Sequence, residues 1–185
     1  MGGGLDLIEK ARLFAQQKHE GQLCKGASGK PYYEHVASVF QILIETIGYK
    51  DSEILAAAYL HDVIEDTNTT QEILAEQFGE GVAVLVQELS DPPNLDEKER
   101  RQSQIDHAPL LSKRAKLIKI ADKISNLEEL ERDPPSNWSI SQQLAYAAWG
   151  EAVFDGLKGL SDGLDTRFRT TIKKVNTKLK PKKMQ

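Results

Sequence analysis

The segment that most constrains the fold is a run of seven uncharged, mostly apolar residues, Ile54 to Leu60, which leads directly into His61 and Asp62. Its composition predicts a helix over residues 53–64 that is apolar on nearly every side. Such a helix has to lie in the centre of a domain, because none of its faces is suited to contact with water. The polar residues at its end are therefore predicted to face the interior.

Four polar residues follow the apolar run at positions i, i+1, i+4 and i+5: His61, Asp62, Glu65 and Asp66. On one continuous helix they fall within an arc of about 140 degrees and form one patch. Three carboxylates beside an imidazole need compensation in an apolar interior, and a divalent cation supplies it most simply where His and Asp are the ligands. The alternative is a helix end with water-exposed acids, and the apolar run favours the metal site.

A second polar group is predicted on one stripe of an otherwise apolar helix over residues 112–130. Its members are Lys119, Asp122, Lys123 and Asn126. Asp122 can supply an oxygen ligand, the two lysines can approach anionic substrate groups, and the Asn126 amide can contact a base edge or a ribose. The alternative is an ordinary wetted face, on which Asp122 and Lys119 form a surface ion pair.

The rest of the chain also shows helical periodicity, and no segment shows the sustained alternation of a strand. Further helices are predicted at residues 5–18, 34–47, 69–79, 82–89, 96–104, 141–160 and 165–179. With 185 residues and 39% hydrophobic content, the chain is long enough for one core and too short for two ordinary domains. We therefore expect one all-α domain over residues 1–185, with its core in about residues 5–160 and a basic helix or tail at about 165–185.

Capping residues mark several of the predicted helix starts. Asp51 or Ser52 can cap the apolar helix, and Ser112 can begin the long one. Thr69 and Glu72 form a capping-box pattern between them.

The charge distribution narrows the possible partners. The formal net charge is −4, but residues 165–185 contain eight Lys or Arg against one Asp, which leaves the remainder strongly acidic. An acidic body argues against nucleic-acid binding. No apolar run approaches the roughly 20 residues of a membrane span, and no secretion signal is evident. The single cysteine, Cys24, excludes an internal disulfide. We expect a cytoplasmic protein that binds neither nucleic acid nor membrane, and the sequence predicts no oligomeric state.

Three segments together resemble a known family: GQLCKGASGKPYYEH (21–35), LHDVIEDT (60–67) and LIKIADKISNLEEL (117–130). In order and spacing they are similar to the hydrolase domain of RelA/SpoT homologues, which belongs to the HD superfamily. The likeness extends over about residues 11–157. Two further segments, DPPSNWS (133–139) and LAYAAWGEAV (144–153), resemble the stand-alone small alarmone hydrolases of the metazoan SpoT-homologue type. The resemblance implies a single-domain, all-helical HD phosphohydrolase fold.

The resemblance also implies roles for individual residues. His35, His61, Asp62 and Asp122 match the ligands of one divalent metal, usually manganese. Glu65 and Asp66 match the acidic pair that positions and deprotonates the attacking water. Residues at positions that contact nucleotide, ribose or phosphate in the family are Lys25, Lys98, Arg100, Arg101, Asn126, Trp138 and Tyr146. Cys24 stands where relatives usually have an arginine that can stack on the purine, which leaves the preference between guanine and adenine open.

The implied activity is metal-dependent release of pyrophosphate from the 3′ position of guanosine or adenosine alarmones, the small nucleotides of the stringent response. Two alternatives stay open: removal of a phosphate from another nucleotide, such as the 2′-phosphate of NADPH, and nucleotide sensing without catalysis. Among the remaining polar and aromatic residues, Trp149 is expected in the core, and His19 and His107 are expected to face water. Cys24 is expected in a flexible loop and chemically idle.

Overall fold

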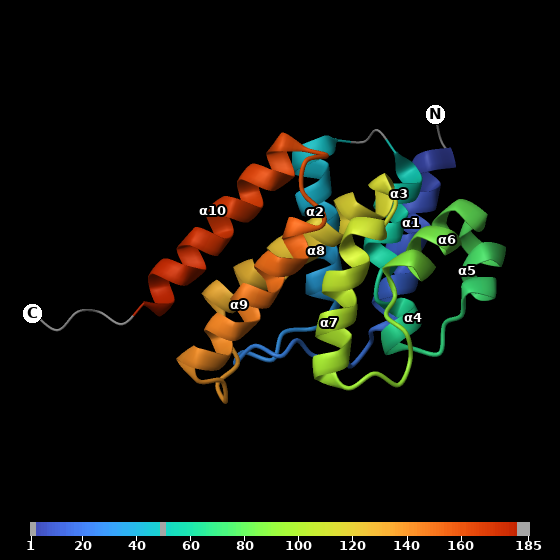
Figure 1. Ribbon diagram of the computed structural model, residues 1–185. Coiled ribbons are helices and arrows are strands. Elements are labelled where there is room, and N and C mark those ends of the chain that lie inside the picture. Colours follow the sequence, from blue (N-terminus) through green and yellow to red (C-terminus); the bar gives the residue numbers. More distant parts are fainter. Residues whose placement is uncertain (1–2, 49–50, 181–185) are drawn as a thin grey trace, which may run out of the picture.

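The computed structural model describes residues 3–48 and 51–180, and the regular elements in these two ranges are all helices (Figure 1). The α-helices are α1 (Gly3–Lys18), α2 (Tyr33–Ile47), α3 (Ser52–Leu60), α4 (Val63–Asp66), α5 (Gln71–Phe78), α6 (Glu80–Leu89), α7 (Glu97–His107), α8 (Lys113–Arg132), α9 (Ile140–Asp155) and α10 (Asp162–Leu179). A short 3-10 helix, Ala108–Leu110, joins α7 to α8, and one isolated antiparallel bridge pairs Leu23 with Pro31. The predicted all-α fold is confirmed.

The helix at the centre is α3, as its sequence predicts. Every residue from Ile54 to Leu60 is buried, none with more than 5% of its surface exposed. α3 packs against α1, α2, α6 and α8, so each of its sides meets another helix. Asp51 caps its N-terminus by accepting the backbone N–H groups of Glu53 and Ile54, and Arg114 from α8 donates to the same carboxylate. Because α3 is capped and buried, it sets the positions of His61 and Asp62, which follow it directly.

The chain departs from the predicted continuous helix directly after this run. α3 ends at Leu60, His61 and Asp62 form a turn, and α4 begins at Val63. Successive residues on a regular helix point about 100 degrees apart, and here the chain leaves the helix at two neighbours that both belong to one cluster. The turn allows both side chains to enter the same cluster. A second consequence is that Glu65 and Asp66 open onto solvent instead of facing the interior.

Another correction concerns the start of α5. Thr70, and not Thr69, caps this helix by accepting the backbone N–H of Ile73. Thr69 is buried, and its hydroxyl is engaged with the hydroxyl of Thr67 at 2.8 Å, which removes it from the capping position. Ser112 caps α8 as predicted, accepting the N–H of Ala115.

The last helix extends the core beyond the predicted limit near residue 160. α9 ends at Asp155, and α10 then packs along α8 and α9 (Figure 1). Leu164, Phe168 and Val175 are buried, and the Phe168 ring stacks on Phe154 with centroids 4.0 Å apart. The amphipathic spacing of α10 explains its packing: its apolar residues lie on the side that faces α8 and α9, and its basic residues lie on the outer side. Residues 181–185 of the predicted tail lie outside the described residues.

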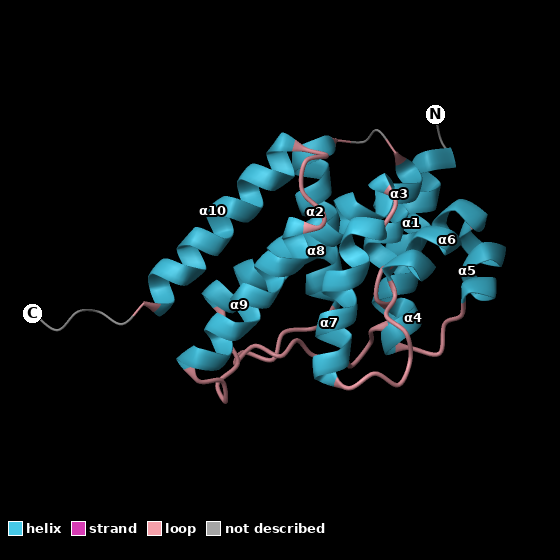
Figure 2. Ribbon diagram, in the orientation of Figure 1, coloured by secondary structure: helices cyan, strands magenta, loops and turns pink. Residues whose placement is uncertain are grey.

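Several of the loops that connect the helices gather at one end of the bundle, at the bottom of Figure 2, whereas the loop between α9 and α10 lies at the opposite end. They include the segment before α2, the segment between α4 and α5, and the segments before α7 and α9. No described helix has the length and apolar content needed to cross a bilayer. The loop end is where the chemically active side chains converge.

Candidate functional site

The centre of the site is a cluster of two histidines and two aspartates from three places in the fold. His35 lies in the first turn of α2, His61 and Asp62 follow α3, and Asp122 lies in the middle of α8. The His61 Nε2 atom is 3.1 Å from Asp62 Oδ2 and 3.8 Å from Asp122 Oδ1. The His35 Nε2 atom is 3.3 Å from Asp122 Oδ1 and 3.7 Å from Asp62 Oδ2. Three of these residues, His35, His61 and Asp62, present possible ligand atoms within 4.8 Å of one another.

The hydrogen bonds of the two histidines fit a metal site. His61 Nδ1 lies 2.9 Å from the carbonyl oxygen of Ala58, which can only accept, so Nδ1 bears the hydrogen. Its Nε2 atom is buried and has no hydrogen-bond partner among the described residues. His35 contacts the Ser125 hydroxyl through Nδ1 at 3.2 Å, which leaves its Nε2 directed at the carboxylates. Metal-binding histidines are held in this way, and the donor set suits one divalent cation.

The charges of the cluster act strongly on one another. Burial alone would lower the pKa of His61, but the carboxylates of Asp62 and Asp122 raise it to about 10. Burial alone would raise the pKa of Asp122, but Lys123 and the two histidines hold it well below its usual range. Burial would also raise the pKa of Asp62, but the two histidines likewise hold it below its usual range, so both aspartates stay charged and a positive charge between them is strongly favoured.

Tyr32 is a member of the site that the sequence did not reveal. Its hydroxyl donates to Asp62 Oδ2 at 2.5 Å, and its ring packs beside His35 with centroids 5.4 Å apart. Burial and the nearby carboxylate of Asp62 raise the pKa of Tyr32 far above its usual range, so it remains a donor. The available signal was its position three residues before His35, one helical turn away.

Tyr32→Phe is expected to weaken divalent-metal binding by about 10- to 100-fold, because removal of a hydrogen bond to a carboxylate that could hold the metal typically has this effect. The phenyl ring keeps the packing on His35, so the melting temperature of the metal-free protein should change little. Calorimetric titration of the variant with Mn²⁺ measures the affinity. An unchanged dissociation constant would show that Tyr32 does not orient Asp62.

The acidic pair lies at the edge of the cluster, where α4 meets the loop before α7. Glu65 accepts the backbone N–H of Asp91 at 2.9 Å. Partial burial and the charge of Asp62 raise the pKa of Glu65 to about 7, and the same two causes raise the pKa of Asp66. A carboxyl group with a pKa near neutrality can both accept and release a proton at working pH.

Three members of the histidine–aspartate cluster and both acids line one cavity of about 220 Å³, here called the catalytic pocket for the role predicted from the sequence. Seven of the nine predicted substrate residues line it: Lys25, Arg101, Lys119, Lys123, Asn126, Trp138 and Tyr146. Arg100 also lines it. Lys98 does not, because it faces a neighbouring groove between α7 and α9. Cys24 lines an adjoining cavity that shares Lys25 and Asn126 with the pocket.

The cations of the pocket are held in place by specific contacts. Lys123 is buried, with Nζ 3.2 Å from Asp122 Oδ2 and 4.2 Å from the centre of the Trp149 ring. Lys119 donates to the carbonyl oxygen of Leu89. Arg101 lies over the rings of Tyr146 and Trp149. Trp149, expected in the core, is partly buried and lines the pocket, where its indole N–H donates to the Arg101 carbonyl and ties α9 to α7.

Two smaller expectations need correction. His19 does not face water: only 2% of its surface is exposed, its Nδ1 lies 2.7 Å from Gln22 Oε1, and its ring packs on Tyr32. Cys24 is not in an open loop but buried, and burial together with the Glu129 carboxylate raises the pKa of its thiol to about 12. That pKa agrees with a chemically idle thiol. His107 is exposed as expected.

Comparisons with known proteins identify the class of protein. An HD domain model matches residues 11–157, and the chain belongs to the HD domain family. Among curated proteins it is similar to guanosine-3′,5′-bis(diphosphate) 3′-pyrophosphohydrolase MESH1 of Xenopus tropicalis, with 40% identity over 168 residues, 91% of this chain and 94% of that protein. Homo sapiens MESH1 is 38% identical over 173 residues, 94% of this chain and 97% of that protein.

A solved structure agrees with the sequence relatives. It is described as a metazoan ortholog of SpoT that hydrolyzes ppGpp and plays a role in starvation responses, and it matches with a TM-score of 0.87 and 35% identity. The match covers 90% of this chain and 94% of that one. Within the HD family the chain therefore groups with the MESH1 relatives, as its sequence motifs predict.

Proposed function

We propose that this chain is a metal-dependent pyrophosphohydrolase that removes the 3′-pyrophosphate of guanosine or adenosine alarmones, with manganese as its metal. The observation that supports the metal site most directly is the buried His61 Nε2 atom, which has no hydrogen-bond partner among the described residues and faces two charged aspartates. The names of the MESH1 relatives and of the matching solved structure support the substrate and the bond that is cleaved. His35, His61, Asp62 and Asp122 would hold the metal.

The residues of the chain divide the chemistry between them. When bound, a divalent cation supplies Lewis-acid polarisation of the scissile phosphoryl group and neutralises its charge. Glu65 or Asp66 accepts the proton of the attacking water and holds the water in line with the scissile P–O bond. Lys119, Lys123 and Arg101 place positive charge around the pocket, where they can pair with substrate phosphates. In-line attack places the leaving ribose oxygen on the opposite side of the phosphorus from the water, so its proton comes from solvent or from a second group of the pocket, and the proton taken from the water returns to solvent.

Neither alternative receives comparable support. A phosphatase acting on the 2′-phosphate of NADPH would use the same metal cluster, but the relatives named above are 3′-pyrophosphohydrolases. A non-catalytic sensor would not need two solvent-open acids beside the cluster, one of them with its pKa raised to about 7.

The purified protein should release pyrophosphate from ppGpp and ppApp in the presence of Mn²⁺ and lose this activity on addition of a chelator. Product chromatography with guanosine alarmones, adenosine alarmones and NADPH in parallel separates the candidates. Release of inorganic phosphate from NADPH, with no pyrophosphate from either alarmone, would contradict the proposal. Nucleotide binding without any product would favour the sensor.

A further inference from the structure

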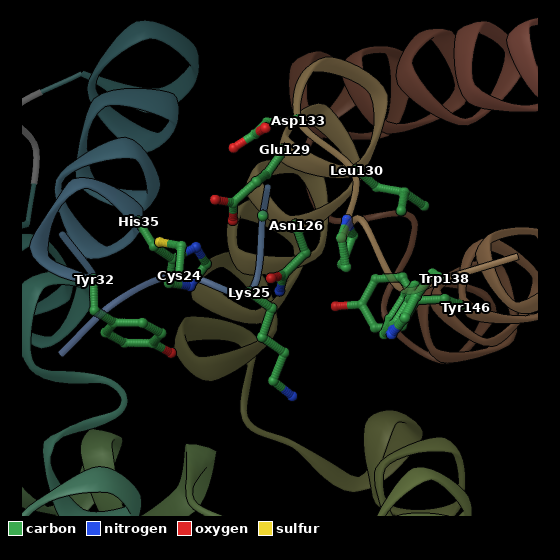
Figure 3. Close-up of a pocket in the computed structure, with 12 residues that line it drawn as sticks. Cys24, Lys25, Tyr32, His35, Asn126, Glu129, Leu130, Asp133, Trp138 and Tyr146 are labelled. Carbon is green, nitrogen blue, oxygen red and sulfur yellow. The ribbon is translucent and has the colours of Figure 1, made fainter. Parts of the chain in front are cut away.

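Beside the catalytic pocket lies a second cavity, here called the side cavity, of about 150 Å³. Cys24, Glu129 and Asp133 line it together with the aromatic side chains of Trp138 and Tyr146 (Figure 3). A cavity of this size accommodates an aromatic ring. Because His35 and Asn126 also line the catalytic pocket, a nucleotide with its 3′-phosphates at the metal cluster can place its base here.

Three side chains with an amide or carboxylate group line the side cavity and could contact a base, namely Asn126, Asp133 and Glu129, and the first two are already committed. Asn126 donates its amide nitrogen to Asp122 Oδ1 at 2.6 Å, so it supports a proposed metal ligand. Asp133 accepts hydrogen bonds from the backbone N–H and the hydroxyl of Ser28, and it holds the loop before α2 in place. Both are therefore poorly placed to discriminate between bases.

Glu129, unlike Asn126 and Asp133, has a side chain that is available to contact a base. It extends from α8 toward Cys24, with Trp138 and Tyr146 across the cavity (Figure 3). Among the residues that the structure describes, its carboxylate forms no ion pair, and its polar neighbour is the Cys24 thiol. A charged, partly buried carboxylate without a cationic partner gains from two hydrogen-bond donors supplied by a ligand.

We propose that Glu129 reads the base and makes the enzyme prefer guanine to adenine, an inference that rests on the proposed function. An ionised carboxylate only accepts, and the N1–H and 2-amino groups of guanine offer two adjacent donors. Adenine has an acceptor at N1 and no amino group at C2, so the same carboxylate repels it. The small, uncharged Cys24 side chain leaves Glu129 without an ion pair, whereas an arginine at position 24 would compete for the carboxylate.

Glu129→Gln tests this directly. In the wild type, kcat/KM for ppGpp should exceed that for ppApp by about 10- to 100-fold, the value of one good bidentate contact to a base. The variant should lose most of that preference, chiefly through a higher KM for ppGpp, because its amide can offer only one acceptor to guanine and can donate to adenine N1. The kcat for ppGpp should stay near that of the wild type, since the metal cluster and the acidic pair are unchanged.

Glu128→Gln is the matched control. It makes the same charge change at the neighbouring position, but Glu128 binds Arg167 of α10 outside the side cavity. It should leave the base preference unchanged. A loss of preference as large as that of Glu129→Gln would mean that helix charge, and not a contact with the base, sets the preference, and this would overturn the proposal.

A substrate series provides a test that needs no variant. The inosine analogue of ppGpp keeps N1–H and lacks the 2-amino group, so its KM in the wild type should lie between those of ppGpp and ppApp. In Glu129→Gln the inosine and guanosine substrates should become nearly equal. Identical KM values for all three bases in the wild type would overturn the proposal.

Measurements of nucleotide binding test the role of Glu129 independently of the proposed catalytic function. Calorimetric titration with GMP and AMP measures base preference without turnover. Tighter binding of GMP, lost in Glu129→Gln, would support base reading by Glu129 even if no alarmone were hydrolysed, in which case the proposed function alone would fail. Hydrolysis of alarmones together with equal binding of GMP and AMP would overturn the role of Glu129 and leave the proposed function standing.

Discussion

Asp62→Asn and His61→Ala are each expected to abolish both manganese binding and turnover. Asp62 Oδ2 lies 3.1 Å from His61 Nε2 and accepts the Tyr32 hydroxyl, so an amide at this position removes the charge and disturbs its neighbours. His61→Ala removes the nitrogen that the Ala58 carbonyl orients toward the carboxylates. Calorimetric titration with Mn²⁺ and a pyrophosphate-release assay measure the two losses. Wild-type affinity and rate in either variant would refute the assignment of these ligands.

The change in melting temperature on addition of Mn²⁺ tests the same ligand assignment independently. A ligand that binds only the folded state stabilises it by about 2.7 kcal/mol at 100 times its dissociation constant, so added Mn²⁺ should raise the wild-type melting temperature by several degrees. The two variants should melt at the same temperature with and without Mn²⁺. In the metal-free protein, loss of the Asp62 charge relieves its repulsion from Asp122, which offsets part of the stability lost with its other contacts.

The sequence predicted those features that depend on local periodicity. The run from Ile54 to Leu60 required a buried helix, and that helix lies at the centre of the fold. The polar stripe of α8 was recognisable for the same reason, since Lys119, Asp122 and Lys123 interrupt an apolar face and are buried. Neither pattern could show that the two helices meet. The family motifs supplied that information, and the measured distances between His61 and Asp122 agree with it.

Features that arise from contacts between elements were not predictable. The helix ends at Leu60, and nothing in the periodicity of residues 53–64 marks that end, whereas the cluster that His61 and Asp62 join also includes residues of α2 and α8. In the sequence, Tyr32 is not distinguishable from other aromatic residues near helix starts. Its role depends on the hydrogen bond from its hydroxyl to Asp62, which forms only in the folded chain. Glu129 belonged to an ordinary charged stretch of α8, and only the cavity between this helix, the Cys24 loop and α9 distinguishes it from Glu128.

Glu65→Gln and Asp66→Asn should separate chemistry from binding. An amide keeps the shape of the carboxyl group but cannot accept a proton from water at neutral pH, so at least one variant should lose roughly 100-fold or more in kcat. In Glu65→Gln the side-chain carbonyl can still accept the Asp91 N–H that positions Glu65 in the wild type, so the local structure should persist. Manganese affinity should stay close to that of the wild type, because the four proposed ligands are intact.

Single-turnover kinetics with saturating Mn²⁺ and ppGpp would measure the chemical step for each variant. The larger loss identifies the residue that takes the proton, and the smaller loss identifies the one that orients the water. The two acids sit beside the same charged group, since Asp62 raises the pKa of both, so the double variant should lose less than the product of the single effects. Wild-type rates in both single variants would mean that the pair is structural, and the proton acceptor would then have to be sought elsewhere in the catalytic pocket.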